Sequence, residues 1–142
     1  MAVYALDTSA VSAALREEPG ADVVRRVLSE AENSPETVVL MPFMALMEIE
    51  YTSLRDETQR RVDRWLAWVS NWPVQVMEST YEWRRTAAIV KSRYRLSLAD
   101  AWVAALALIN DATLLHKEPE FDAVGDLQHL RLPYDRDIRA ST

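Results

Sequence analysis

The 142-residue sequence has no cysteine, two histidines and two glycines. The absence of cysteine excludes disulfide bonds and thiolate metal sites, and it is typical of proteins in a reducing compartment. With imidazoles available only from His116 and His129, a zinc site built on histidine nitrogen is not expected. Any bound metal ion would therefore be held by oxygen ligands, the donors that hard cations prefer.

Long apolar runs are also missing, and the N-terminus lacks the features of a secretory signal. The scarcity of glycine and the absence of a Gly/Ser/Pro-rich linker predict short loops and one compact domain. We expect this domain to cover residues 1–134, with a polar C-terminal tail at 135–142. A cytoplasmic protein without membrane attachment is expected.

The formal net charge is −6. Proteins that coat nucleic acid are usually basic, because neutralisation of phosphates drives their binding. The acidic balance therefore argues against a bulk nucleic-acid binder. It remains compatible with an enzyme that cuts nucleic acid using a carboxylate-held metal, and with a basic protein partner.

Short apolar runs alternate with segments of helical periodicity along the chain, a pattern typical of a parallel sheet covered by helices on both faces. Pro42 is expected to open a helix, because proline is favoured in the first helical turn. Strands are expected at 2–6, 37–41, 74–77, 113–115 and 129–132, and helices at 9–16, 20–32, 42–54, 58–72, 80–94 and 97–110, with a short helix in PEFDAV.

Asp7 directly follows the first predicted strand, in the stretch VYALDTSAV. Ligands of open α/β sheets bind outside the carboxyl ends of the strands, which makes Asp7 a candidate site residue. The alternative is that Asp7 only caps the following helix, as Asp, Thr and Ser all do well.

Two further acids lie on predicted helices. Asp100 follows Ser97 with the spacing of a capping box, and the apolar helix behind it is expected to be buried. A carboxylate at the mouth of a buried helix needs a partner, and a metal ion would be one. Glu48, in FMALMEIEY, points either to solvent or into a cleft, with Glu50 as its solvent-facing companion.

Glu118 comes just after the predicted strand 113–115, in TLLHKEPEF, and could equally belong to an exposed turn with Glu120. The joint pattern favours a site, because three strand-to-helix junctions carry an acid at the same end and a fourth acid lies on a helix packed nearby. Several carboxylates in one pocket raise one another's pKa or require a cation. Mg²⁺ or Mn²⁺ fits such a set best.

The ordered segments LDTSAV, PFMALMEIEY, LSLADAWVAALAL, ATLLHKEPEFDAV and LRLPY resemble the PIN-domain family over essentially the whole chain. The nearest group looks like the VapC-type toxins of toxin–antitoxin pairs. The resemblance implies a three-layer α/β/α fold with a central, mostly parallel sheet and a Mg²⁺- or Mn²⁺-dependent ribonuclease. It also implies homodimers and an antitoxin that binds a groove between the early helices.

The resemblance maps the four family acids to Asp7, Glu48, Asp100 and Glu118. Asp7, Asp100 and Glu118 would ligate the metal, and Glu48 would orient or deprotonate the attacking water, leaving a 5′-phosphate and a 3′-hydroxyl. Thr8 and Ser9 complete the first motif as substrate-binding hydroxyls. The fourth acid is usually Asp in the family, so Glu118 is a departure, and Glu120 or Asp122 could share its role.

Five cations precede Asp100 and suggest a track for single-stranded RNA. We assign RNA contact to Arg93 and Arg95, which are nearest to Asp100 in the sequence, with Tyr94 as a stacking side chain. The alternative is an ordinary solvated helix face. The set comprises Arg84, Arg85, Lys91, Arg93 and Arg95.

Trp65, Trp68 and Trp72 recur at helical spacing and indicate either core or interface. His116 is expected to be structural. Two rival functions remain, an inactive PIN-like protein-interaction module and a flap-type DNA nuclease. The converging acids argue against the first, and the lack of a DNA-clamping insertion argues against the second.

Overall fold

The computed structural model describes residues 1–134. The predicted tail, residues 135–142, lies outside the described residues. Five strands form one sheet in the order β3-β2-β1-β4-β5, and all four neighbouring pairs are parallel. The strands are β1 (Ala2–Leu6), β2 (Thr37–Pro42), β3 (Gln75–Met77), β4 (Thr113–His116) and β5 (His129–Arg131).

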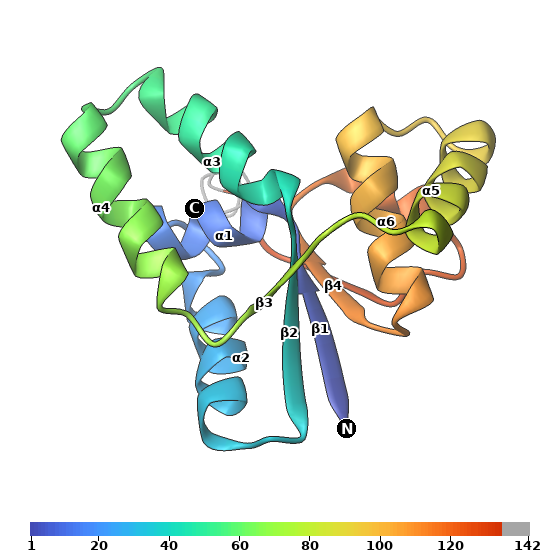
Figure 1. Cartoon of the computed structure of the whole chain (residues 1–142), viewed down its shortest axis with the longest axis horizontal. Coiled ribbons are helices and arrows are strands. Elements are labelled where there is room, and N and C mark those ends of the chain that lie inside the picture. The colour runs from blue at the N-terminus through green and yellow to red at the C-terminus, as the bar shows by residue number, and fades with distance from the viewer. Residues whose placement is uncertain (135–142) are drawn as a thin grey trace, which may run out of the picture.

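Helices cover both faces of this sheet, so the predicted three-layer α/β/α architecture is confirmed (Figure 1). One side carries α1 (Thr8–Arg16), α2 (Ala21–Asn33), α3 (Met44–Leu54) and α4 (Gln59–Ser70); the other carries α5 (Tyr81–Arg93) and α6 (Leu98–Ile109). A short 3₁₀ helix, η1 (Pro119–Ala123), follows β4. No helix within residues 1–134 has the length and apolarity needed to cross a membrane.

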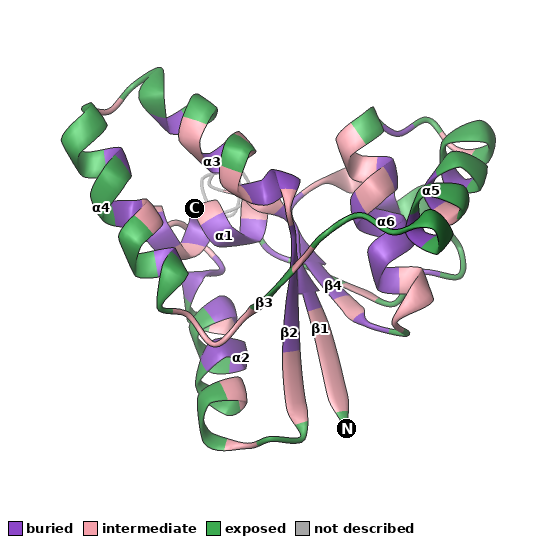
Figure 2. Ribbon diagram, viewed as in Figure 1, coloured by how far each residue is buried: buried purple, intermediate pink, exposed green. Residues whose placement is uncertain are grey.

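Two hydrophobic clusters fill the spaces between the layers. Successive side chains of a strand point to opposite faces, so Ala5 joins the cluster under α5 and α6, while Leu6 joins the cluster under α1 to α4. Leu114 and Leu115 of β4 divide in the same way. Each fully buried leucine contributes roughly 1.5–3 kcal/mol relative to an exposed one. Figure 2 shows that the C-terminal halves of β1 and β2 are the buried halves.

One predicted boundary is wrong. Pro42 ends β2 instead of opening a helix, and α3 begins only at Met44. The pairing of β1 with β2 stops at Leu40, so the N–H that Pro42 lacks is not needed on that side. On the other side the backbone N–H of Phe43 donates to the Met77 carbonyl and continues the contact with β3.

Because all strands run in the same direction, their carboxyl ends lie at one edge of the sheet. The central strand β1 pairs with β2 on one side and with β4 on the other. Leu6, the last residue of β1, is in register with Leu115 of β4. The residues that follow β1, β2 and β4 are therefore brought together at this edge, although long segments of chain separate them.

Candidate active site

Asp7 lies at the junction of β1 and α1 and is only 5% exposed. Its Oδ2 atom accepts hydrogen bonds from the Ser9 hydroxyl (2.6 Å) and the Ser9 backbone N–H (3.3 Å), so Asp7 does cap α1. Burial raises its pKa to about 7, against the lowering effect of the Ser9 bonds, and the charges of Asp100 and Glu118 raise it further. A helix cap alone does not require this crowding of like charges.

Ser9 ties Asp7 to the end of β4. Its hydroxyl oxygen accepts a hydrogen bond from the backbone N–H of Lys117 (3.0 Å) while donating to Asp7. The backbone N–H of Asp7 in turn donates to the Leu115 carbonyl (3.1 Å). This pair of contacts fixes the carboxylate of Asp7 relative to the segment that carries Glu118.

Glu48 is half-buried on α3 and points toward the start of α1. Its Oε1 atom accepts a hydrogen bond from the Thr8 hydroxyl (3.0 Å). Of the two orientations considered from the sequence, the structure shows the one directed into the protein. Glu50 is also half-buried and lines an apolar cavity between α3, α4 and the sheet, so it is less exposed than a solvent-facing companion was expected to be.

Asp100 lies in the first turn of α6 and is half-buried. The predicted cap is present, because the Ser97 hydroxyl accepts a hydrogen bond from the Asp100 backbone N–H (3.1 Å). Burial raises the pKa of the Asp100 carboxyl to about 6; the Ser97 hydroxyl opposes this, and the charges of Glu118, Glu48 and Glu120 add to it.

Glu118 follows β4 in the extended conformation expected before Pro119. Its Oε2 atom accepts a hydrogen bond from the Tyr134 hydroxyl (3.3 Å), and its backbone N–H donates to Nδ1 of His116 (3.0 Å). Its negative charge contributes to raising the pKa of both Asp7 and Asp100. We call Asp7, Glu48, Asp100 and Glu118 the acidic cluster, because electrostatic repulsion links them across four parts of the fold.

The donors of the acidic cluster suit a hard divalent cation, since all are carboxylates and none forms an ion pair with a cationic side chain within residues 1–134. A bound cation would relieve the repulsion that raises the pKa of Asp7 and Asp100. In the same part of the chain, no group of three or more His, Asp or Glu side chains lies close enough together to hold a metal ion as it stands.

A sequence model of the PIN domain matches residues 4–127, which is most of the chain. The chain belongs to the PIN-domain family. Its fold is similar to a chain of VapBC2 from Rickettsia felis, solved with a DNA fragment from the promoter, with a TM-score of 0.76 at 14% identity over 92% of this chain and 99% of that one.

VapC20 from Mycobacterium tuberculosis, described as a toxin that cleaves the sarcin–ricin loop, gives a TM-score of 0.67 at 18% identity, covering 93% of this chain and 100% of that one. DNA-bound VapBC from Salmonella typhimurium gives 0.72 at 14% identity, with coverages of 92% and 98%. At such identities the likeness shows the fold. No curated protein matches the sequence.

In this PIN domain His116 is a buried structural residue, as the sequence suggested. Its Nε2 atom is 2.8 Å from Nδ1 of His129, and the two rings stack with centroids 5.0 Å apart. Burial, with a smaller contribution from the nearby His129, lowers the pKa of His116 to about 4. The Asp122 carboxylate lies 3.9 Å from His129 Nδ1 and 3.6 Å from Arg131 Nη1. It is therefore directed toward His129 and Arg131 and not toward the acidic cluster.

Lys117 was missed by the sequence analysis. It is only 5% exposed, and its Nζ atom lies 3.5 Å from Oε1 of Glu18, at the far end of α1. A lysine directly after a strand usually belongs to a solvated turn, and only its place between two other candidate residues could have singled it out. Its backbone N–H supports Ser9, so Lys117 belongs to the framework of the PIN-domain site.

The cations chosen from the sequence do not contact the acidic cluster. Arg93 and Arg95 are exposed, and neither makes an ion pair or side-chain hydrogen bond within residues 1–134. They are also not among the charges that shift the pKa of Asp7 or Asp100. Tyr94 is half-buried and packs against the hydrophobic cluster under α5 and α6. RNA contact by these residues stays a prediction.

The tryptophan stripe of α4 divides between the core and the surface. Trp65 is buried between the guanidinium groups of Arg16 and Arg61, whose carbons lie 4.9 Å and 5.3 Å from its ring centroid. Trp72 is half-buried in the cluster under α1 to α4, whereas Trp68 is 50% exposed.

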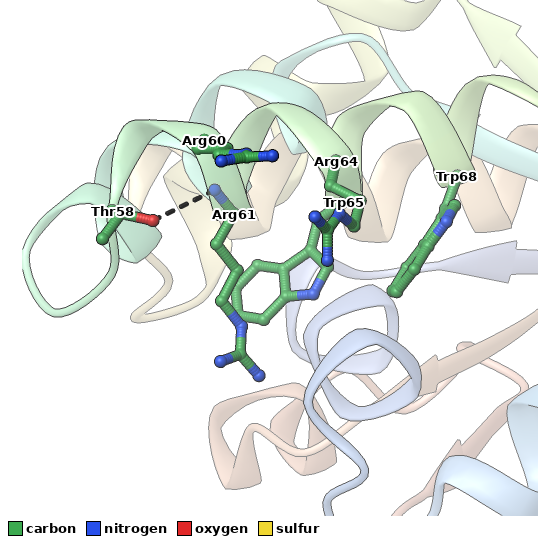
Figure 3. Close-up of a pocket in the computed structure, with 6 residues that line it drawn as sticks. All are labelled: Thr58, Arg60, Arg61, Arg64, Trp65 and Trp68. Atoms are coloured by element: carbon green, nitrogen blue, oxygen red, sulfur yellow. Dashed lines mark hydrogen bonds between the residues drawn. The ribbon is translucent and has the colours of Figure 1, made fainter.

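Trp65 and Trp68 also help to line a surface cavity of about 450 Å³, which we call the α4 cavity (Figure 3). Its other lining residues are Thr58, which caps α4, and three arginines. The arginines are Arg60, Arg61 and Arg64. The PIN domain therefore carries a cationic and aromatic surface on a helix that holds none of the four acids.

Proposed function

We propose that this PIN domain is a metal-dependent endoribonuclease and the toxin of a toxin–antitoxin pair. The observation that carries the proposal is the acidic cluster: four carboxylates from separate elements, two of them with a pKa raised by burial and by one another. Keeping buried like charges together is costly unless they hold a cation. Membership of the PIN family adds a fold that positions them at the ligand-binding edge of the sheet.

Asp7, Asp100 and Glu118 would hold Mg²⁺ or Mn²⁺. Such a cation lowers the pKa of a water molecule and neutralises the charge that develops on a phosphate. Glu48, held by the Thr8 hydroxyl, would orient or deprotonate the attacking water. Ser9 would keep Asp7 in place through its bonds to that carboxylate and to Lys117. The products would be a 5′-phosphate and a 3′-hydroxyl.

Support for the toxin assignment comes from the similar folds of VapC-type proteins. Two were solved as VapBC with DNA, and a third, a VapC, is described as a toxin that cleaves the sarcin–ricin loop. By analogy this chain would pair with an antitoxin and form a homodimer. With a net charge of −6, it would favour an antitoxin with basic segments.

The test is cleavage of matched single-stranded RNA and DNA oligonucleotides by the purified full chain, with Mg²⁺ and then with excess chelator. We expect RNA cleavage that the chelator abolishes and that Asp100→Asn loses while remaining folded. Cleavage of DNA instead of RNA would favour the flap-type alternative. A folded protein that cleaves neither would favour the interaction module.

A further inference from the structure

We infer that a groove at the β2 and β3 side of the acidic cluster is a subsite for single-stranded RNA, binding a base and its flanking phosphates. The inference rests on the proposed ribonuclease function and goes beyond it by naming where the substrate is held. We call this surface the Arg84 groove.

The Arg84 groove consists of two adjoining cavities that share Arg84 and Trp102. The first, of about 420 Å³, is lined by Phe43, Ser79, Thr80, Tyr81, Arg84 and Trp102. The second, of about 330 Å³, continues between α5 and α6 and adds Lys91 and Leu98 with small side chains. Together they form a path with Tyr81 and Phe43 in the first cavity, Arg84 and Trp102 where the two cavities join, and Lys91 in the second.

The Arg84 groove shares two elements with the acidic cluster. Phe43 directly follows β2 and precedes α3, the helix of Glu48. Trp102 lies on α6, the helix that carries Asp100, but on a different side of it, because residues two apart in a helix do not share a face. Ser79 and Thr80 follow β3, so the first cavity is at the same carboxyl edge of the sheet as the acids. A strand that continued from the first cavity along this edge would reach the cluster with one of its neighbouring phosphates.

The ring of Trp102 is held in place before any ligand arrives. It packs edge-on against Trp83, with centroids 4.9 Å apart, and against Phe43 at 6.1 Å. The indole N–H of Trp83 donates to the Trp102 carbonyl (2.7 Å). Trp102 is half-buried and lines both cavities of the groove. A fixed ring with an accessible surface is a suitable platform for a nucleobase.

Tyr81 supplies a second accessible ring, 68% exposed, beside two guanidinium groups. The carbons of Arg84 and Arg85 lie 5.2 Å and 5.7 Å from its centroid, and Arg85 Nη1 donates to its hydroxyl (3.3 Å). Within residues 1–134, neither arginine nor Lys91 pairs with a carboxylate. These free cations would attract phosphates that the acidic cluster alone would repel.

RNA fits this surface better than an acidic peptide does. Single-stranded nucleic acids are bound by grooves in which cations contact the backbone and aromatic rings stack on the bases. The position of the first cavity at the same carboxyl edge as the acids favours the substrate over a regulatory partner as its occupant. Binding of a peptide or of a second copy of the chain is treated as an outcome of the test.

The test measures binding of a fluorescein-labelled single-stranded RNA of mixed sequence by anisotropy, with chelator present so that no cleavage occurs. Tyr81→Ala and Arg84→Gln should each weaken binding by about tenfold, the lower part of the range for one stacked base. Tyr81→Phe should retain binding, because it keeps the ring. Arg84→Gln should also reduce the salt slope by about 0.7, as expected for one phosphate contact on a single strand.

Arg64→Gln, in the α4 cavity, is the matched control because it removes the same charge from another surface. In Mg²⁺, the groove variants should raise KM with little change in kcat, and their circular dichroism melting curves should match the wild type. If the wild type binds RNA and both Tyr81→Ala and Arg84→Gln bind it with the same affinity, the inference is overturned while the proposed function stands. An equal loss in Arg64→Gln would also overturn it, because binding would then follow net charge.

A change in sedimentation between monomer and dimer caused by the groove variants, with RNA affinity unchanged, would assign the surface to a second copy and also overturn the inference. Loss of affinity for poly-glutamate peptide but not for RNA would assign it to an acidic protein segment, with the same consequence. A wild type that neither binds nor cleaves RNA would overturn the proposed function as well.

Discussion

The acidic cluster draws its carboxylates from the start of α1, from α3, from α6 and from the segment after β4, whereas the α4 cavity takes its lining from one helix and its cap. In the first region, burial and mutual repulsion raise the pKa of Asp7 and Asp100. In the second, the charges are exposed to solvent, which screens them.

The difference separates two ways of gathering charge. A helix places residues three and four apart on one face, so the arginines of the α4 cavity follow from sequence spacing alone. The acidic cluster exists only because a parallel sheet brings distant segments to one edge. Its like charges oppose folding, which makes the cluster a candidate functional site. Substitutions in the two regions should therefore have very different consequences.

The largest effect is expected for Asp7→Asn. Losing this carboxylate would remove one of the proposed cation ligands and should lower kcat for RNA cleavage by about 10³-fold, the upper range for loss of one charge-stabilising group. Arg64→Gln should leave kcat unchanged. Initial rates with saturating RNA and Mg²⁺ check this, with melting curves to verify folding. Equal rates for wild type and Asp7→Asn would remove Asp7 from the site.

The next largest effect is expected in the pH dependence of stability. A carboxyl with a pKa of about 7 in the folded state and near 3.8 when unfolded holds its proton longer in the folded protein. Its contribution to stability is therefore fully present below pH 4 and decreases as the pH rises toward 7. Asp100, with a pKa of about 6, adds to this decrease over a narrower range.

Asp7→Asn does not titrate, so it should gain stability over the wild type as the pH rises. Between pH 5 and pH 8 we expect the difference in unfolding free energy to shift by roughly 2–3 kcal/mol in favour of the variant. Urea unfolding in the presence of chelator measures it. A constant difference across this range would mean that Asp7 is already ionised at pH 5.

A smaller effect should decide which residue is the fourth acid. The charge of Glu118 raises the pKa of both Asp7 and Asp100, whereas the charge of Glu120 raises that of Asp100 alone. Asp122 pairs with His129 and Arg131. Glu118→Gln should slow cleavage on the order of tenfold, or about 1.4 kcal/mol of barrier. Glu120→Gln should have less effect, and Asp122→Asn none on kcat. The reverse order would move the role to Glu120.

The smallest effect belongs near the α4 cavity. Arg16 pairs with Asp56 through two hydrogen bonds of 3.0 Å and 3.1 Å, and the Arg16 side chain holds the pKa of Asp56 below its usual value. Both groups meet solvent, so Asp56→Asn should change the urea midpoint only slightly, and less so in high salt. A large, salt-independent loss would show that this pair matters structurally.

The sheet, its covering helices and most boundaries could be predicted because they depend on local periodicity. Asp7 and Asp100 were found because each sits at a helix start with a local capping signal. The wrong assignment of Pro42 came from the same local rules, since its strand position depends on where the pairing with β1 stops. No local rule contains that information.

Long-range packing explains the other differences. Proximity in sequence singled out Arg93 and Arg95, whose contact with RNA stays a prediction, whereas the packing of α5 against α6 places Arg84 and Lys91 along the groove. The burial of Lys117 depends on Glu18, a residue of the distant α1–α2 connection. Glu50 is half-buried because α4 folds back over α3. Each outcome is decided by an element far away in the chain.

The central claim is that Asp7, Asp100 and Glu118 together hold a divalent cation, and calorimetric titration of Mn²⁺ into the full chain tests it most directly. The account predicts saturable binding to the wild type at pH 8, its loss in Asp7→Asn and Asp100→Asn, and no change in Arg64→Gln. Binding of equal strength in all four proteins, or none to a folded wild type, would contradict it.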